Sequence, residues 1–299
     1  MMANLRQESL RGELRFNEPM SRHTSLRVGG VAEQFFCPAD LDDLSLFLCE
    51  LDPGTALFWL GLGSNLLVRD GGLRGVVIAT ANLLRDIDQL DDQRVRAGAS
   101  VTCTQLSRQC IRWGFGPSEF FAGIPGTLGG ALAMNAGAHG NETWQRVESV
   151  RTIDRQGEIR DRQPGDYAIR YRSVVGPTEE WFIEATLKFD PDAIASMDTQ
   201  KLMLERRKST QPLGLPSCGS VFRNPEGDHA ARLIEAAGLK GHRIGGAEVS
   251  IKHANFIINV AAATATDVEN LITFVHDTVK AVHDVDLIHE VRIVGEDGK

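Results

Sequence analysis

Residues 123–140 constrain the fold more than any other part of the sequence. They read G-I-P-G-T-L-G-G-A-L-A-M-N-A-G-A-H-G, with six glycines, one proline and no aspartate, glutamate, lysine or arginine. Glycine within an element costs stability, because the unfolded chain loses more conformational freedom there than at any other residue. The segment therefore predicts either tight backbone turns or a surface where another group lies directly against the backbone.

The overall composition is that of a globular protein. The chain has 299 residues, of which 42% are hydrophobic and 24% charged, and its net charge is −8. The length favours two or three domains. The acidic balance argues against a dedicated nucleic-acid-binding protein, because phosphate binding requires a basic face. The first residues have no apolar signal-peptide core and no apolar run is long enough to span a membrane, so we expect no membrane insertion.

Cysteine and histidine usage bears on location and on metal binding. The five cysteines are scattered and include no C-x-x-C pair. Such a set indicates reduced thiols and a cytoplasmic location. The eight histidines show neither H-x-x-x-H spacing nor clustering with cysteine. We therefore expect no metal site.

Helices and strands alternate in the first part of the chain. Asp40 is suited to cap a helix whose apolar residues keep a helical spacing. Strands are expected at 56–60 and 75–80, on either side of a second glycine-rich segment. Thr102 and Gln105 form a predicted capping box for the next helix.

The later part of the chain also mixes both kinds of element. A hairpin is expected over 147–162, and the pattern changes at 189–193, where we place a domain boundary. Asp228 is predicted to start a short helix. Thr266 and Glu269 are predicted to form the capping box of the last long helix. These alternations indicate the α+β class with several domains.

The second glycine-rich segment, Gly61 to Leu66, follows a predicted strand and reads G-L-G-S-N-L. It is not a P-loop, because no G-K-[ST] follows, and Leu66 stands where the dinucleotide fingerprint requires a third glycine. Backbone N–H groups in such a turn can converge on an anion, and Ser64 and Asn65 add neutral donors. Alone, the segment is more simply a tight turn. Together with residues 123–140, it suits a long ligand with a diphosphate in the middle and a ring at one end.

Seven motifs between residues 27 and 295 carry a family resemblance. They are R-V-G-G (27–30), G-L-G-S-N-L-L-V-R-D-G-G (61–72), A-G-I-P-G-T-L-G-G-A-L-A-M-N-A-G-A (122–138), Y-R-S (171–173), C-G-S-V-F-R-N-P (218–225), A-G-L-K-G (237–241) and H-E-V-R-I-V-G (289–295). In kind and order they resemble the UDP-N-acetylenolpyruvoylglucosamine reductase (MurB) family. The resemblance implies a vanillyl-alcohol-oxidase-type (PCMH-type) FAD-binding fold in two subdomains, residues 1–80 and 81–190. It also implies a C-terminal α+β substrate-binding domain, residues 191–299.

The resemblance further implies an enzyme of peptidoglycan precursor synthesis in the bacterial cytoplasm, acting as a monomer. NADPH would reduce a non-covalently bound FAD, which would pass hydride to the vinyl carbon of UDP-N-acetylglucosamine enolpyruvate to give UDP-N-acetylmuramate. The FAD contacts are expected in the two glycine-rich segments. They are Gly61, Gly63, Ser64, Asn65, Leu66, Ile124, Pro125, Gly126, Thr127, Gly130, Asn135 and Gly137.

Three further residues match the family's catalytic positions. Hydride addition leaves negative charge beside the substrate carboxylate, so the site requires donors at that carboxylate and a proton source at the carbon. Arg172 matches an arginine whose guanidinium fork suits a carboxylate. Ser220 matches the serine that acts as the acid, and Glu290 the glutamate that helps Arg172 to polarise the substrate. Without the resemblance, Arg172 and Glu290 would be read as solvated strand residues and Ser220 as a turn residue.

Substrate binding is expected from Lys208, at the diphosphate, and from Asn224. The spacings between the catalytic motifs are short, which indicates the subgroup without the extra tyrosine loop. Asn141 departs from the family pattern, in which a glycine is common. Two other functions stay open: a flavin oxidase of the same fold class, and a nucleotide-sugar-binding protein without catalysis.

Overall fold

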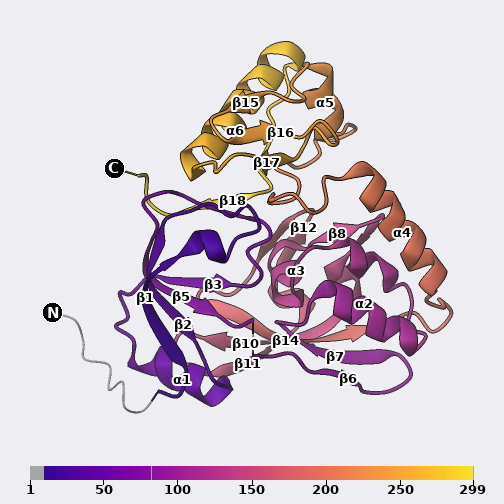
Figure 1. Cartoon of the computed structure of the whole chain (residues 1–299). Coiled ribbons are helices and arrows are strands. Elements are labelled where there is room, and N and C mark those ends of the chain that lie inside the picture. The colour runs from indigo at the N-terminus through magenta and orange to yellow at the C-terminus, as the bar shows by residue number, and fades with distance from the viewer. Residues whose placement is uncertain (1–9, 82, 299) are drawn as a thin grey trace. The chain divides into compact units, whose positions relative to one another are not determined.

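The computed structural model describes residues 10–81 and 83–298 (Figure 1). These residues form two compact units. Unit 1 comprises the chain up to Arg15, Phe36–Gly61 and Val77–Arg206, and unit 2 comprises Phe16–Phe35, Leu62–Val76 and the chain from Arg207 onward. The chain thus passes between the units several times, and the predicted division at residues 80 and 190 stays a prediction.

Unit 1 is built on an antiparallel sheet with the strand order β11-β10-β14-β7-β6. In β14 every second residue is buried, namely Ile183, Ala185 and Leu187, because successive side chains of a strand point to opposite faces. Strands β10 and β11 form the hairpin that the sequence predicts. The bounds are β6 (Ile87–Gln89), β7 (Arg94–Gly98), β10 (Val147–Asp154), β11 (Ile159–Arg162) and β14 (Glu180–Lys188).

The helices of unit 1 begin where the capping signals predict. The Asp40 side chain accepts a hydrogen bond from the backbone N–H of Asp43, and Thr102 and Gln105 form the capping box of α2. Helix α3 packs against β7 and β14 (Figure 1). Its apolar side chains join those of α2 in the core of the unit. The bounds are α1 (Leu41–Glu50), α2 (Cys103–Arg112), α3 (Leu128–Met134) and α4 (Met197–Thr210).

Several short strands complete the chain's first two thirds. A four-stranded sheet has the order β1-β2-β5-β3, and two small antiparallel hairpins pair β8 with β9 and β12 with β13. The bounds are β1 (Glu13–Pro19), β2 (Val31–Cys37), β3 (Leu57–Leu60), β5 (Leu73–Ala79), β8 (Gly137–Ala138), β9 (Asn141–Glu142), β12 (Ala168–Arg170) and β13 (Ser173–Val175). Single 3-10 turns are η1 (Met20–Arg22), η2 (Glu119–Gly123), η3 (Thr143–Arg146) and η4 (Pro164–Asp166).

Unit 2 has its own core around the last long helix, α6 (Ala265–His283). The buried face of α6 carries Val268, Leu271, Ile272, Val275 and Val279, whereas Val282, which has the same helical spacing near the end of the helix, is 57% exposed. The helix packs against α5 (Ala230–Ala236) and the sheet β15-β16-β17. The strand bounds in this unit are β4 (Leu66–Val68), β15 (Arg243–Ile244), β16 (Ala247–Val249), β17 (Ile257–Asn259) and β18 (Arg292–Val294).

The start of α6 corrects one prediction. The capping box is formed by Thr264 and Asp267, two residues before the predicted pair, Thr266 and Glu269. Both pairs have suitable side chains at the right spacing, so the local signal does not distinguish them. The predicted pair instead binds another part of the chain.

That other part is the R-D-G-G motif of residues 69–72. Arg69 forms an ion pair with Glu269 at 2.7 Å. The Asp70 carboxylate accepts hydrogen bonds from the N–H groups of Ala265 and Thr266, at 3.0 and 2.9 Å, and from the Thr266 hydroxyl at 2.7 Å. A carboxylate from a distant loop thus satisfies the free N–H groups at the start of α6.

Helix α5 gives a second correction of the same kind. Asp228, the predicted cap, accepts hydrogen bonds from the His229 N–H and the Arg232 guanidinium. The N–H of Ala230, the first helical residue, donates instead to the side-chain oxygen of Asn224 at 3.2 Å. A residue four positions earlier therefore takes the capping role.

We expect Asp70→Ala to lower the free energy of unfolding of unit 2 by about 1–2 kcal/mol at pH 7, the usual cost of losing a helix cap. Burial by itself would raise the pKa of Asp70, but the hydrogen bonds from Thr266 and Ala265 outweigh it and lower the pKa. The contribution is therefore complete above the unfolded-state pKa of about 4 and is lost as the pH falls through the lower folded-state value.

Thermal unfolding of the wild type and the variant between pH 3 and pH 7 measures this difference. Asp192→Ala is the control, since Asp192 is exposed in a loop of unit 1. Equal melting temperatures for wild type and Asp70→Ala at pH 7 would contradict the role of Asp70.

Candidate active site

Contacts within unit 1 explain most of the glycines in residues 123–140. A Cβ atom built on Gly123, Gly129 or Gly137 would lie 2.7, 3.0 or 2.2 Å from a neighbouring atom. Gly140 has a φ of +81°, which side chains rarely adopt. At Gly123, Gly137 and Gly140 the chain itself requires glycine, without any ligand, and at Gly129 a side chain would force Ala99 to shift.

Gly130 differs from these four glycines. It is exposed, its φ is not positive, and a Cβ built on it would have its nearest neighbour, Thr127 Oγ1, at 3.7 Å. The fold therefore has room for a side chain here. The absence of one leaves the backbone at the start of α3 accessible, which fits a cofactor that lies against it.

The two glycine-rich segments meet in unit 1. A Cβ on Gly61 would lie 2.9 Å from Thr127 Oγ1, so the end of the first segment lies against the second. Thr127 is held in place because its hydroxyl accepts a hydrogen bond from the Gly130 N–H and because it is only 3% exposed. This contact supports the prediction that both segments line one ligand.

The remaining residues of the first segment lie in unit 2. Gly63 has a φ of +60°, and a Cβ there would lie 2.1 Å from the His23 carbonyl oxygen, so the fold requires this glycine. Ser64 is partly exposed, and its hydroxyl makes no hydrogen bond within the described chain. Leu66 is buried, so any contact it makes with a cofactor would use its backbone.

A parallel strand pair brings the first segment to Glu290. Strands β4 and β18 pair in the register Leu66 with Arg292, so the residues that precede each strand lie side by side. Asn65 Nδ2 donates to the Glu290 carbonyl oxygen at 2.9 Å, and the Arg292 N–H donates to the Asn65 carbonyl oxygen at 3.1 Å. Asn65 and Glu290 are thus positioned together by backbone pairing.

Ser220 joins the same group of residues. The carbonyl oxygen of the next residue, Val221, accepts hydrogen bonds from the N–H groups of Glu290 and Val291, at 2.8 and 3.2 Å. The predicted acid and the predicted glutamate therefore lie on two adjacent, paired segments of unit 2. Ser220 is partly exposed, and its hydroxyl has no hydrogen-bond partner among residues 10–81 and 83–298.

Asn255 was not predicted, yet it holds the Ser220 segment in place. Its side-chain oxygen accepts from the Phe222 N–H and its amide nitrogen donates to the Phe222 carbonyl oxygen, at 2.9 and 2.8 Å. Its carbonyl oxygen accepts from the Val221 N–H at 2.9 Å, and the residue is 3% exposed. The sequence does contain an indication of this role, because Asn255 is a single asparagine within the apolar run A-N-F-I-I and a buried amide requires hydrogen-bond partners.

Cys218 has no part in the chemistry. It is 1% exposed, and burial raises the pKa of its thiol to about 12, with a smaller contribution from the Glu290 carboxylate. The thiol is therefore protonated at neutral pH, and a thiol is a poor nucleophile.

The predicted substrate-binding residues also lie in unit 2. Lys208 is exposed in the last turn of α4, and its carbonyl oxygen accepts a hydrogen bond from Lys252 Nζ at 2.5 Å. Lys252, which was not predicted, is thereby held beside it. Asn224 is exposed and uses its side-chain oxygen to cap α5, so its amide N–H groups are the ones it can offer to a substrate.

Arg172 is tied to the second glycine-rich segment in unit 1. Its Nη1 donates to the Asn135 carbonyl oxygen at 3.3 Å and its Nη2 to the Gly137 carbonyl oxygen at 2.8 Å. The guanidinium also lies 4.9 Å from the centre of the Tyr171 ring. The structure therefore brings Arg172 together with two of the predicted FAD-binding residues.

The neighbouring arginines are engaged differently. Arg160 forms an ion pair with Asp154 at 2.9 Å, and Arg162 pairs with Glu180. These pairs belong to the surface of the β11-β10-β14 sheet, whereas the guanidinium of Arg172 is directed to backbone carbonyls of the glycine-rich segment. The contacts of Arg172 with these carbonyls therefore argue against reading it as one more residue of a solvated strand face.

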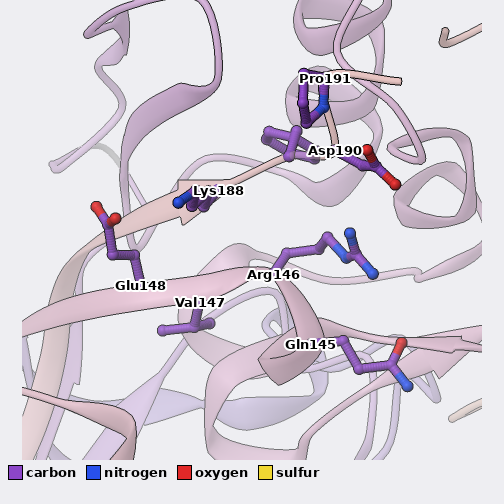
Figure 2. Close-up of a pocket in the computed structure, with 8 residues that line it drawn as sticks. Gln145, Arg146, Val147, Glu148, Lys188, Asp190 and Pro191 are labelled. Atoms are coloured by element: carbon purple, nitrogen blue, oxygen red, sulfur yellow. The ribbon is translucent and has the colours of Figure 1, made fainter. Parts of the chain in front are cut away.

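A pocket of about 410 Å³ in unit 1 contains none of the predicted site residues (Figure 2). Its two cationic side chains, Arg146 and Lys188, face a lining that also carries the carboxylates of Glu148 and Asp190. The charges balance, so the lining does not select an anion. The complete lining is Gln145, Arg146, Val147, Glu148, Lys188, Phe189, Asp190 and Pro191.

The described residues, 10–81 and 83–298, contain neither a cluster of metal-binding side chains nor a membrane-spanning helix. No group of three or more histidine, cysteine, aspartate or glutamate side chains is arranged to hold a metal ion. No helix in this part of the chain has the length and apolar character needed to cross a membrane.

Comparisons with known proteins agree with the geometry. Residues 32–162 match the FAD binding domain family, and residues 211–294 match the UDP-N-acetylenolpyruvoylglucosamine reductase C-terminal domain. A UDP-N-acetylenolpyruvoylglucosamine reductase of Alkalilimnicola ehrlichii is 59% identical over 95% of this chain and 96% of its own. The chain belongs to this reductase family. A second member, from Methylococcus capsulatus, is 55% identical over 96% of this chain and 94% of its own.

A solved MurB structure shows the same architecture. The crystal structure of the enzyme from Thermus caldophilus superposes with a TM-score of 0.79 at 29% identity, over 95% of this chain and 99% of that one. The predicted family, the α+β fold with an FAD-binding domain and the FAD cofactor are confirmed. The oxidase and the non-catalytic binding protein have no support among these matches, and the roles of the individual site residues stay predictions.

We expect Gly130→Asp to weaken FAD binding at least tenfold. The carboxylate would occupy the open surface beside Thr127 and repel a diphosphate there, where solvent screens it incompletely. Helix formation is not at risk, because an acidic residue in the first turn of a helix is stabilising. Fluorescence titration of the apoprotein with FAD gives the dissociation constant.

The matched control is Gly165→Asp, another exposed glycine of unit 1 that has no atom within 4 Å of a built Cβ. It carries the same charge change and should bind FAD as the wild type does. Unaltered FAD affinity in Gly130→Asp would show that the cofactor does not lie against the start of α3.

Proposed function

We propose that this protein reduces the enolpyruvyl ether of UDP-N-acetylglucosamine to the lactyl ether, forming UDP-N-acetylmuramate with NADPH as the reductant. The observation that supports the proposal is the backbone pairing of the segment after Ser220 with the Glu290 segment, which in turn binds Asn65 of the first glycine-rich segment. The named relatives, up to 59% identical over nearly the whole chain, support it.

The FAD would be held by both glycine-rich segments. Gly61, Thr127 and Gly130 would offer it backbone groups. Ser64 is a further proposed contact through its hydroxyl. When bound, FAD supplies the hydride that the substrate's vinyl carbon accepts. We propose that the binding is non-covalent, because the only histidine in these segments, His139, is not used for linkage in the family.

Ser220 is the proposed proton donor. Hydride addition at the vinyl carbon leaves an enolate whose carbon, next to the carboxylate, requires a proton. A serine hydroxyl is a weak acid in water, but an enolate carbon is a strong base, so proton transfer between them is favourable. The Ser220 hydroxyl is available, because no residue of the described chain binds it.

Arg172 is proposed to stabilise the negative charge that develops on the substrate carboxylate, and Glu290 is proposed to help Arg172 to polarise the substrate. The two backbone carbonyls that bind Arg172 orient its guanidinium fork, which suits a carboxylate with two oxygens. Oriented groups of this kind act most strongly where charge increases in the transition state. Glu290 is oriented through its backbone, by Val221 and Asn65.

Lys208, Lys252 and Asn224 are proposed to bind the nucleotide-sugar. The Lys252 ammonium lies at the Lys208 backbone, so two cationic residues are available for one diphosphate. Asn224 adds neutral donors from the start of α5.

We also propose a monomer in the bacterial cytoplasm. No disulfide joins any of the five cysteines, all of which lie in the described part of the chain, and this supports a reducing compartment. Size-exclusion chromatography with light scattering measures the oligomeric state: a mass near 32.7 kDa supports the monomer and one near twice that value excludes it.

Ser220→Ala should separate the two half-reactions. Reduction by NADPH requires no proton on a substrate carbon, so we expect its rate to remain nearly unchanged. Reoxidation by the enolpyruvyl substrate should slow by roughly a hundredfold or more, the usual effect of losing a general acid. Stopped-flow absorbance at the flavin bands records both rates in one protein.

Ser220→Cys is the matching rescue variant, because a thiol can donate a proton from the same place. It should recover part of the lost rate. If Ser220→Ala slows both half-reactions equally, Ser220 positions the substrate or the cofactor and the proton has another source.

Lys208→Ala should raise the Kd of the enolpyruvyl substrate by roughly tenfold to a hundredfold, since a hydrogen bond to a charged group contributes about 1.5–3 kcal/mol. Isothermal titration calorimetry with the oxidised enzyme measures this Kd. Lys201→Ala, an exposed lysine two turns earlier in α4, is the control and should leave the Kd unchanged. Equal substrate affinities for the two variants would show that Lys208 does not bind the substrate.

A further inference from the structure

Asn135 occupies a buried position where its side-chain amide is fully engaged with the protein. Its Nδ2 donates to Glu142 Oε2 at 2.8 Å and to the Arg170 carbonyl oxygen at 3.2 Å. Its Oδ1 accepts from the Trp144 N–H at 3.1 Å, and the residue is 1% exposed. Both amide N–H groups are used and no surface of the side chain faces outward, so the amide is not available to a ligand.

The backbone of Asn135 is turned to serve another residue. Asn135 ends α3 in the left-handed conformation, with φ of 46° and ψ of 50°. Its carbonyl oxygen and that of Gly137 accept the two hydrogen bonds from the guanidinium of Arg172. A left-handed residue reverses the chain after a helix, and this reversal leads the backbone from Asn135 to Gly137.

The same side-chain amide also holds the end of the strand that leads to Arg172. One of its N–H groups binds the carbonyl oxygen of Arg170, the last residue of β12 and two positions before Arg172. Asn135 thus fixes both partners of the contact: the carbonyls that accept from the guanidinium and the main chain from which the arginine extends.

Glu142 fixes the amide in turn. Its carboxylate accepts from Asn135 Nδ2 and from the Gln145 N–H, while the Gln145 side chain accepts from the Glu142 N–H at 3.0 Å. This reciprocal capping box anchors Glu142 at the start of η3. A hydrogen bond to an ionised acceptor is stronger than one between neutral groups, so it selects one orientation of the Asn135 amide.

We infer that Asn135, anchored by Glu142, is a positioning residue that sets the orientation of the Arg172 guanidinium, and that its side chain makes no contact with FAD. The inference rests on the proposed function, in which Arg172 binds the substrate carboxylate. A guanidinium fork binds a carboxylate through two parallel hydrogen bonds, so a small rotation of the fork lowers the rate steeply.

Asn135→Gly tests the first part. Glycine adopts the left-handed conformation without strain, so the substitution removes the amide and keeps the turn. We expect reoxidation by the enolpyruvyl substrate to slow roughly tenfold to a hundredfold, the effect of a misplaced catalytic group. Reduction by NADPH and the FAD affinity of the apoprotein should stay within about twofold of wild type. An FAD affinity that falls by tenfold or more would overturn the inference, because it would make the amide a cofactor contact.

A double-mutant cycle with Arg172→Ala tests whether Asn135 acts through the arginine. If it does, Asn135→Gly should cause no further loss of the reoxidation rate once Arg172 is absent. Independent, multiplying losses would overturn the positioning role. If Arg172→Ala alone leaves reoxidation unaffected, the proposed function of Arg172 fails, and that result is distinct from a failure of the cycle.

Glu142 supplies a second route that does not depend on the folding of Asn135→Gly. Glu142→Ala removes the acceptor of the Asn135 amide and should slow reoxidation selectively. Glu142→Gln keeps an oxygen that can accept from Asn135 Nδ2, so it should restore most of the rate. If Glu142→Ala reoxidises as fast as the wild type, the anchoring of Asn135 by Glu142 is refuted.

Discussion

The parallel pairing of β4 with β18 is the interaction on which the proposed chemistry of unit 2 depends. Residues 65 and 290 lie 225 positions apart in the chain, yet the register of this pair brings Asn65 to the backbone of Glu290. A third segment, that of Ser220, then pairs with the Glu290 segment through the carbonyl of Val221. Backbone pairing has little freedom of register once three segments share it, so the backbone from which these side chains extend is held in one arrangement.

Two buried asparagines have similar tasks in the two units. Asn255 in unit 2 binds both backbone groups of Phe222, and Asn135 in unit 1 binds the segments on either side of the Arg172 contact. An amide offers donors and an acceptor in one plane, and a buried amide is costly unless these groups are bound. Each asparagine therefore stabilises one arrangement of the backbone beside a proposed catalytic residue. The proposed catalytic side chains can remain partly exposed because buried amides hold the backbone that carries them.

Local signals were sufficient where no distant residue competed for the same groups. Asp40 and the Thr102–Gln105 box start their helices as predicted. At α6 the sequence offers two overlapping boxes, and Asp70 of the R-D-G-G motif decides between them by binding the N–H and the hydroxyl of Thr266. A capping signal states only that a side chain can bind the helix start. Which side chain does so depends on what the fold brings to that place.

The sequence by itself determined the family, the fold class and the cofactor, because seven motifs in a fixed order are a much stronger signal than any one of them. It also identified the two glycine-rich segments. Only the tertiary structure decided why particular glycines are there. A Cβ atom on Gly137 or Gly63 would lie only 2.2 Å or 2.1 Å from a backbone carbonyl oxygen, whereas Gly130 leaves an open surface. The steric demand at a glycine is set by atoms from elsewhere in the chain, and the sequence does not state which atoms those will be.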